Sequence, residues 1–181
     1  MSAFNRLRIR TFKRDERAVS AVEFALLAPM MIGLYLGGVE ISEGISVDRK
    51  VTLAAGAVAN LAAQTATLST ADMTNVLDAT TTIIAPYSAA PLKITVSCIS
   101  IDANKVATVK WSVTRNGTIK SGSVTLPSAL QVANTQLLFG EVSYDYTPTV
   151  GHVIKSAITL SDTMYMAPRI TAPKYNGTAC T

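Results

Sequence analysis

The chain begins with a polar, basic stretch and turns almost wholly apolar between residues 18 and 39. This run, AVSAVEFALLAPMMIGLYLGGV, has 22 residues, and Glu23 is its single charged side chain. As an α-helix it would be about 33 Å long, enough to cross the ~30 Å hydrocarbon core of a bilayer. Its apolar residues cover every face, so the pattern predicts a membrane-spanning helix and not an amphipathic surface helix.

The helical pattern extends beyond the apolar run. Apolar positions recur at near-helical spacing through residues 45–66, so we expect the helix to continue as an amphipathic stalk. Residues 71–85, ADMTNVLDATTTIIA, predict a second, short helix with Thr70 as its N-cap. Prolines then follow and indicate a loop.

After Pro91 the apolar period changes from helical to alternating. Four segments alternate and are rich in β-branched or aromatic residues, and we expect them to be strands: 92–102, 105–114, 136–148 and 156–168. Asn116-Gly117 is a strong hairpin signal and leads into a further strand within residues 119–126. The fold class expected is α+β, with a long N-terminal membrane-spanning helix, a stalk and a small antiparallel-sheet head.

Charge is concentrated in the N-terminal tail. Residues 1–17 hold six basic and two acidic side chains, which accounts for the whole net charge of +4, because the remaining ten basic and ten acidic residues cancel. A basic tail beside an apolar span fits the rule that Lys and Arg stay on the cytoplasmic side, so we expect no nucleic-acid partner. The head would then lie outside the cytoplasm.

Three interpretations of the stretch RAVSAVEFALLAP (residues 17–29) and the run that follows it are open. A secretory signal peptide usually has a shorter apolar region that ends at a small-x-small site, to which Ser42 and Gly44 are a poor match. A plain single-span anchor would remain uncut. In a prepilin-type leader the cut falls before the apolar segment, here between Ala18 and Val19, and the segment stays in the product.

Glu23 favours the third interpretation. A charged side chain costs about 2.5–3.5 kcal/mol at the centre of a membrane helix, and less near its end, where it can reach the interface. Cleavage after Ala18 would create an ammonium group at Val19, one helical turn from Glu23. The carboxylate could then neutralise the terminus of a neighbouring subunit, in a low-dielectric setting where charge pairing is strong.

Several stretches resemble one protein family. AVEFALLAP, GLYLGGVEISEG and VTLAAGAVANLAAQ, together covering roughly residues 17–65, are similar to the TadE-like and TadG-like pseudopilins of the tight-adherence (Flp-type) pilus system. EVSYDYTP at 141–148 is a looser match. The resemblance implies a pilin-like plan and cleavage by a prepilin peptidase between Ala18 and Val19, although family members more often have glycine at the position of Ala18.

Other residues of the apolar run are typical of helix assembly. Gly33 and Gly37 form a GxxxG pair, which lets two helix backbones approach closely, although such pairs are also common in ordinary membrane helices. Glu40 and Glu43, near the outer end, are expected to face water and to be available for a contact between subunits.

Little catalytic chemistry is predicted. His152 is the sole histidine, and the sequence has no P-loop, GxGxxG or GxSxG motif, so we expect neither an enzyme nor a cofactor nor a metal site. Cys98 and Cys180 are candidates for one disulfide, since an exported domain meets an oxidising compartment. Trp111 and the tyrosines near residue 145 are expected to pack within the sheet.

The sequence therefore predicts three regions: a basic cytoplasmic leader (1–18), a TadE-like transmembrane helix and stalk (19–66), and an extracytoplasmic α+β head (67–181). The expected function is that of a minor pseudopilin-like structural component in the bacterial inner membrane, incorporated in a pilus or aiding its assembly. Its expected partners are a prepilin peptidase, other pilin-like subunits, the inner-membrane assembly platform and membrane lipid. The alternative is an uncleaved, membrane-anchored adhesin or binding module.

Overall fold

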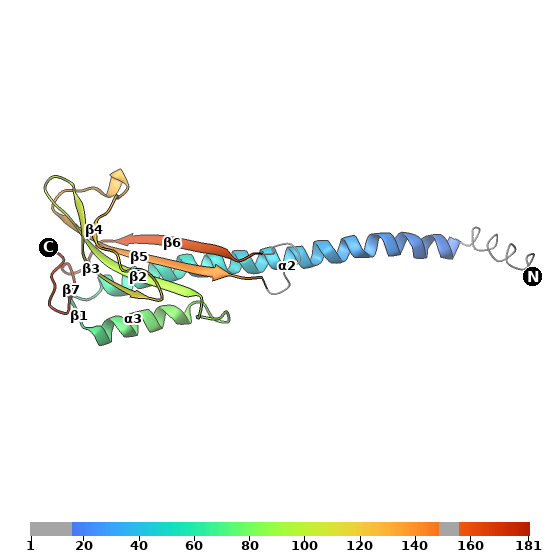
Figure 1. The fold of residues 1–181 in the computed structure, drawn as a ribbon, viewed down its shortest axis with the longest axis horizontal. Coiled ribbons are helices and arrows are strands. Elements are labelled where there is room, and N and C mark those ends of the chain that lie inside the picture. The colour runs from blue at the N-terminus through green and yellow to red at the C-terminus, as the bar shows by residue number, and fades with distance from the viewer. Residues whose placement is uncertain (1–15, 149–155) are drawn as a thin grey trace, which may run out of the picture. The chain divides into compact units, whose positions relative to one another are not determined.

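A computed structural model describes residues 16–148 and 156–181 (Figure 1). The chain divides into two compact units, and we describe each by itself. The first, the N-terminal helical unit, contains residues 16–42 and Pro148 among those described. The second, the sheet unit, comprises residues 43–147 and 156–181. Of the leader predicted at residues 1–18, positions 1–15 lie outside the described residues.

One helix, α2 (Glu16–Ala63), contributes to both units. Its 48 residues include Pro29, and the helix continues past the proline without interruption. The expected continuation of the apolar helix beyond residue 44 is confirmed, and it ends three residues before the predicted limit of 66. The part from residue 43 onward belongs to the same compact unit as the sheet, so it is a packed element of the head and not a separate stalk.

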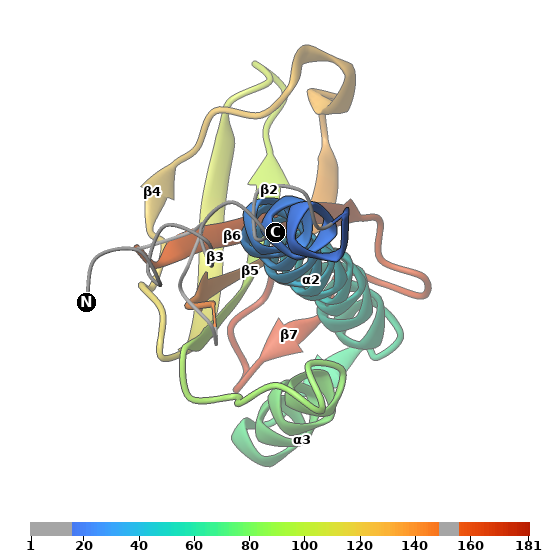
Figure 2. The same cartoon turned by 90° about the vertical axis from the view of Figure 1, so that its right-hand side faces the viewer.

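The sheet unit is built on five antiparallel strands in the order β4-β3-β2-β5-β6 (Figures 1 and 2). Three long strands at the centre are β2 (Leu92–Ile101), β3 (Ala107–Arg115) and β5 (Thr135–Tyr146). The edges are β6 (Ile158–Met166) and the two-residue β4 (Gly122–Ser123), and a short 3-10 turn, η1 (Ser128–Leu130), precedes β5. The α+β class and the four long strands predicted from the sequence are confirmed.

The main core lies between α2 and one face of the sheet. The helix buries residues spaced three or four apart, and the sheet buries alternate residues of its central strands, as periods of 3.6 and 2 require. The fully buried helix residues are Val47, Val51, Ala54, Ala55, Val58, Ala62 and Ala63, and the strands contribute Ile94, Val96, Leu138 and Val142. Because many of the helix side chains are alanines, helix and sheet can approach closely.

The apolar residues of β2 change from one face to the other along the strand, and at that point, between Cys98 and Ile99, the register with β3 shifts by one residue of β3. Beyond it, Ile99 and Ile101 form a second, smaller core with Phe139 and Leu126. The extra residue is Lys110 of β3, and this bulge brings Val109 and Ala107 to the same face as Ile99 and Ile101. The sheet therefore has a polar outer face at one end of β2 and an apolar cluster at the other.

The second helix, α3 (Thr70–Thr82), lies beside α2 in both views (Figures 1 and 2). The predicted N-cap at Thr70 is wrong by one residue. Ser69 caps the helix, because its hydroxyl accepts from the Asp72 backbone N–H while the Asp72 carboxylate accepts from the Ser69 backbone N–H at 2.9 Å. This reciprocal capping box satisfies two backbone donors at once, which fixes the start of the helix.

At the other end of α3, Lys50 of α2 supplies a cation. Its ammonium donates to the carbonyls of Ile83 at 3.1 Å and Ala85 at 2.6 Å. The last carbonyls of a helix have no intrahelical donor and carry partial negative charge, so a lysine from a neighbouring helix stabilises them. Lys50 thereby ties α3 to α2.

The further strand predicted within residues 119–126 is present as β4, which pairs antiparallel with β3, but the two are joined by a longer connection than a tight turn at Asn116-Gly117. Asn116 has the expected positive φ of 55°, but the chain next pairs with β3 at Val109↔Gly122, several residues farther along. Between these points backbone N–H groups donate to side-chain hydroxyls of β3: Gly117 to Thr114 at 3.1 Å and Lys120 to Ser112 at 3.2 Å. These bonds hold the segment as a loop against the polar face of the sheet in place of a paired strand.

The C-terminal segment forms a strand that the sequence did not predict. β7 (Lys174–Tyr175) pairs in parallel with β1 (Thr67–Leu68), which directly precedes α3. The indole of Trp111 donates to the Pro173 carbonyl at 3.0 Å, and its ring lies 5.6 Å from that of Tyr175. The end of the chain is therefore fastened to both the sheet and the α2–α3 connection.

Candidate functional site

The described part of the N-terminal helical unit presents apolar side chains to its surroundings. Between residues 19 and 35, the large apolar residues exposed by half or more are Val19, Val22, Phe24, Leu26, Leu27, Met30, Met31, Ile32, Leu34 and Tyr35. By length and composition α2 is apolar enough to cross a membrane, and its most apolar window is not buried within the molecule. Such a surface is costly in water, so this segment is compatible with membrane anchoring.

The residues predicted for processing and assembly lie along this helix. Val19 and Glu23 are four apart within α2 and therefore on the same face, one turn from each other. Ala18 is also within the helix, but its side chain lies outside the described set. Both Val19 and Glu23 are exposed.

The two glycines of the GxxxG pair differ in their surroundings. Gly33 is exposed, and a Cβ added to it would meet nothing within 4 Å, whereas Gly37 is buried. Gly33 thus leaves the helix backbone open to close approach, as glycine does at helix–helix contacts.

Glu40 departs from the sequence prediction. It was expected to face water, but it is 1% exposed and makes a polar interaction of its own. A buried carboxylate is tolerated where it is hydrogen-bonded or paired, so its burial and its interaction are consistent. Glu43, half-buried, receives a long hydrogen bond of 3.5 Å from the Tyr146 hydroxyl.

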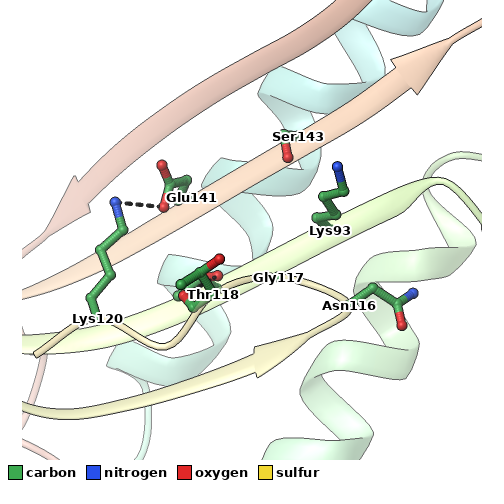
Figure 3. Close-up of a pocket in the computed structure, with 8 residues that line it drawn as sticks. Lys93, Asn116, Gly117, Thr118, Lys120, Glu141 and Ser143 are labelled. Carbon is green, nitrogen blue, oxygen red and sulfur yellow. Dashed lines mark hydrogen bonds and ion pairs between the residues drawn. The ribbon is translucent and has the colours of Figure 1, made fainter.

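A second feature is a polar pocket of about 500 Å³ on the face of the sheet opposite the main core (Figure 3). Three segments line it: β2 with Lys93 and Thr95, β5 with Glu141 and Ser143, and the loop 116–120 with Asn116, Gly117, Thr118 and Lys120. These residues are close in space because β2 and β5 are neighbours and because the loop bonds to β3.

Two ion pairs border the pocket. The Lys120 ammonium is 2.7 Å from a Glu141 oxygen, and Lys93 is 2.8 Å from Asp145 (the first pair is drawn in Figure 3). Hydrogen bonds from Lys93 and from the Thr159 hydroxyl lower the pKa of Asp145, so this carboxylate is charged at neutral pH. Each lysine is therefore balanced by a carboxylate.

The cysteines meet in the sheet unit. Cys98 of β2 and Cys180, next to the last residue, form a disulfide with 5.9 Å between their α-carbons. The disulfide predicted from the sequence between these two cysteines is therefore confirmed. Trp111, Tyr144 and Tyr146 are each about 5% exposed and pack in the core, which confirms the prediction that these aromatic side chains pack and do not form an open surface. Burial raises the pKa of Tyr144.

No metal centre is present among residues 16–148 and 156–181, where three or more His, Cys, Asp or Glu side chains do not gather at one point. His152 lies outside the described residues. The polar pocket was not predicted from the sequence, because Lys93, Lys120 and Glu141 lie in separate segments with no motif of fixed spacing. The alternation of polar residues on the strands is the one sequence signal that could have indicated a polar outer face.

Searches against protein-family models, curated proteins and solved structures give no match to this chain.

Proposed function

We propose that this protein is a membrane-anchored, pseudopilin-like structural component of a tight-adherence pilus assembly or secretion machine. The carrying observation is the placement of Glu23 one turn after Val19 on a helix whose apolar side chains are exposed. A membrane stabilises such an apolar surface, and a carboxylate within it is a candidate for pairing with a positive charge. The resemblance of AVEFALLAP and the segments after it to TadE-like and TadG-like pseudopilins supports the same proposal.

The proposed mechanism is assembly by helix packing. The basic tail stays in the cytoplasm, the apolar part of α2 spans the inner membrane, and the sheet unit lies on the periplasmic side. A prepilin peptidase cuts between Ala18 and Val19, and the new ammonium of one subunit pairs with Glu23 of the next. Gly33, open to its surroundings, would allow a neighbouring helix to approach the backbone.

The mature N-terminus tests this proposal. Intact-mass spectrometry of protein from the native host should show a chain beginning at Val19, and the same protein from a peptidase-deletion strain should keep residues 1–18. A full-length chain in both strains would contradict processing and favour the uncleaved anchor.

Glu23→Gln tests the pairing role. The variant should insert in the membrane at a normal level but lower the yield of surface filaments by about tenfold, since charge pairing with the terminus is lost. Asp48→Asn is the matched control, because it neutralises an exposed carboxylate on the same helix. Equal filament yield from wild type and Glu23→Gln would contradict the mechanism.

A second function is favoured by the polar pocket of the sheet unit. A membrane-anchored binding module needs a preformed polar recess on its exported part, and this pocket is one. In that case the chain would remain uncut, and loss of the protein would leave filament yield unchanged.

A further inference from the structure

The polar pocket has a floor that is held by hydrogen bonds within the protein. Thr95 is 4% exposed, and its hydroxyl lies 3.1 Å from that of Thr114 and 3.4 Å from the Thr118 carbonyl. The neighbouring pair of hydroxyls, Ser97 and Ser112, are 2.9 Å apart. These contacts fix the loop 116–120 against the sheet, so the pocket is formed before any ligand arrives.

Gly117 makes this arrangement possible. A Cβ at this position would lie 2.6 Å from the Thr114 hydroxyl and 2.9 Å from the Thr95 hydroxyl. Both distances are shorter than non-bonded contacts allow, so only glycine fits without a shift of the loop. The wall of the pocket therefore depends on a backbone that approaches the hydroxyl floor directly.

The charges of the pocket favour a neutral ligand. Lys120 is paired with Glu141, and Lys93 with Asp145, so an anion would meet carboxylates and a cation would meet ammonium groups. An ammonium has three donors and a carboxylate about four acceptor sites, so one ion pair leaves both with further capacity. A ligand that both donates and accepts at many points suits this lining, and a polyhydroxyl compound has that property.

An aromatic hollow adjoins the pocket at Lys120. It has a volume of about 250 Å³, and its lining includes Lys120, Phe139 and Tyr165. The rings of Phe139 and Tyr165 lie 4.9 Å apart, and the Lys120 ammonium is 5.0 Å from the centre of the Phe139 ring. An apolar surface next to hydrogen-bonding groups matches a sugar ring, which has hydroxyls at its edge and C–H groups on its faces.

We propose that this pocket binds a neutral saccharide of one or two rings. Its hydroxyls would bond to Lys93, Lys120 and Glu141, and the C–H face of the ring nearest Lys120 would lie toward Tyr165. The proposal rests on residues of the sheet unit alone and is independent of processing at Ala18–Val19 or of filament assembly.

Titration of the full-length chain tests the proposal. The isotope-labelled protein is kept in micelles of an amine-oxide detergent, because detergents with sugar headgroups would compete. Glucose, galactose, mannose and N-acetylglucosamine are added separately, up to about 50 mM, and the amide signals of Gly117, Thr118 and Ser143 are followed. We expect at least one of these sugars to shift all three signals with a Kd on the order of 1 mM.

Charged analogues and variants complete the test. Glucuronate and glucosamine carry one negative and one positive charge on the same ring, and we expect each to bind at least fivefold more weakly than the best neutral sugar. Lys120→Met and Gly117→Ala should each weaken binding about tenfold, whereas Lys110→Met, which removes an exposed lysine outside the pocket, should leave it unchanged.

Folding of every variant is checked by the fluorescence of Trp111, the sole tryptophan. Failure of all four neutral sugars to shift the three signals would overturn the proposal. Tighter binding of glucuronate or glucosamine, or equal weakening by Lys110→Met, would also overturn it.

Discussion

Gly140 of β5 lies directly against the backbone of Ala55 in α2. A Cβ added to Gly140 would be 2.8 Å from the Ala55 carbonyl oxygen and 2.9 Å from the Val58 side chain. The helix and the sheet therefore meet here with no room for a methyl group, and this contact sets the distance between the two layers of the main core.

Gly140→Ala should destabilise the sheet unit. The added methyl group forces the helix away from the sheet, at a cost of about 1–3 kcal/mol, as for other overpacked cores. Urea unfolding followed by Trp111 fluorescence measures the change. Gly56→Ala is the control: the nearest atom is the Met164 methyl at 3.9 Å, and alanine is favoured over glycine in a helix by up to about 1 kcal/mol. Equal stability of Gly140→Ala and wild type would contradict the close contact.

Reduction of the disulfide should loosen the C-terminal segment. Cys98 and Cys180 are 82 residues apart, so their bond restricts a long loop of the unfolded chain and contributes at most about 4.5 kcal/mol. The Cys98→Ala/Cys180→Ala double variant should lose comparable stability in urea unfolding and should not respond to reductant. Because Trp111 donates to Pro173, its emission should also shift to the red when the segment detaches. Wild-type stability that is unchanged by reductant would contradict this role.

Lys50→Met should weaken the attachment of α3 to α2. The substitution keeps a long apolar chain but leaves the carbonyls of Ile83 and Ala85 without their charged donor, at a cost of about 1–2 kcal/mol. Arg49→Met, at the adjacent and exposed position, is the matched control and should change the free energy of unfolding by less than about 0.5 kcal/mol. The prediction fails if the two variants are equally stable.

The capping box of Ser69 and Asp72 predicts that the stability of the protein depends on pH. Hydrogen bonds from the Ser69 hydroxyl and backbone N–H lower the pKa of Asp72 from its ordinary value of 3.8. A carboxyl with a lowered folded-state pKa stabilises the protein above pH 3.8, and this contribution is lost as the pH falls through the folded pKa. Asp72→Asn should therefore be less stable than wild type at pH 7, and the difference should shrink below pH 3.8. A difference independent of pH from 7 to 2 would contradict the charged cap.

Local patterns of the sequence determined the elements of this protein. The apolar run from residue 18 to 39 and the helical spacing after it predicted one long helix, and alternation predicted the strands, since each pattern follows from the geometry of a single element. The Ser69 cap was missed by one residue, because Ser69 and Thr70 are both good N-caps and the position of Asp72 decided between them.

Tertiary structure decided everything that depends on residues far apart in the chain. The pairing of β7 with β1 and the place of Trp111 over the C-terminal segment arise from contacts across 60 or more residues. The strand order depends on pairings such as that of β2 with β5, and periodicity encodes none of these contacts. The burial of Glu40 and the polar pocket are likewise features of the tertiary structure that periodicity does not encode. In the case of Asn116-Gly117, hydroxyls on β3 satisfied the backbone donors of the loop, and this outweighed the local preference for a tight two-residue turn between β3 and β4.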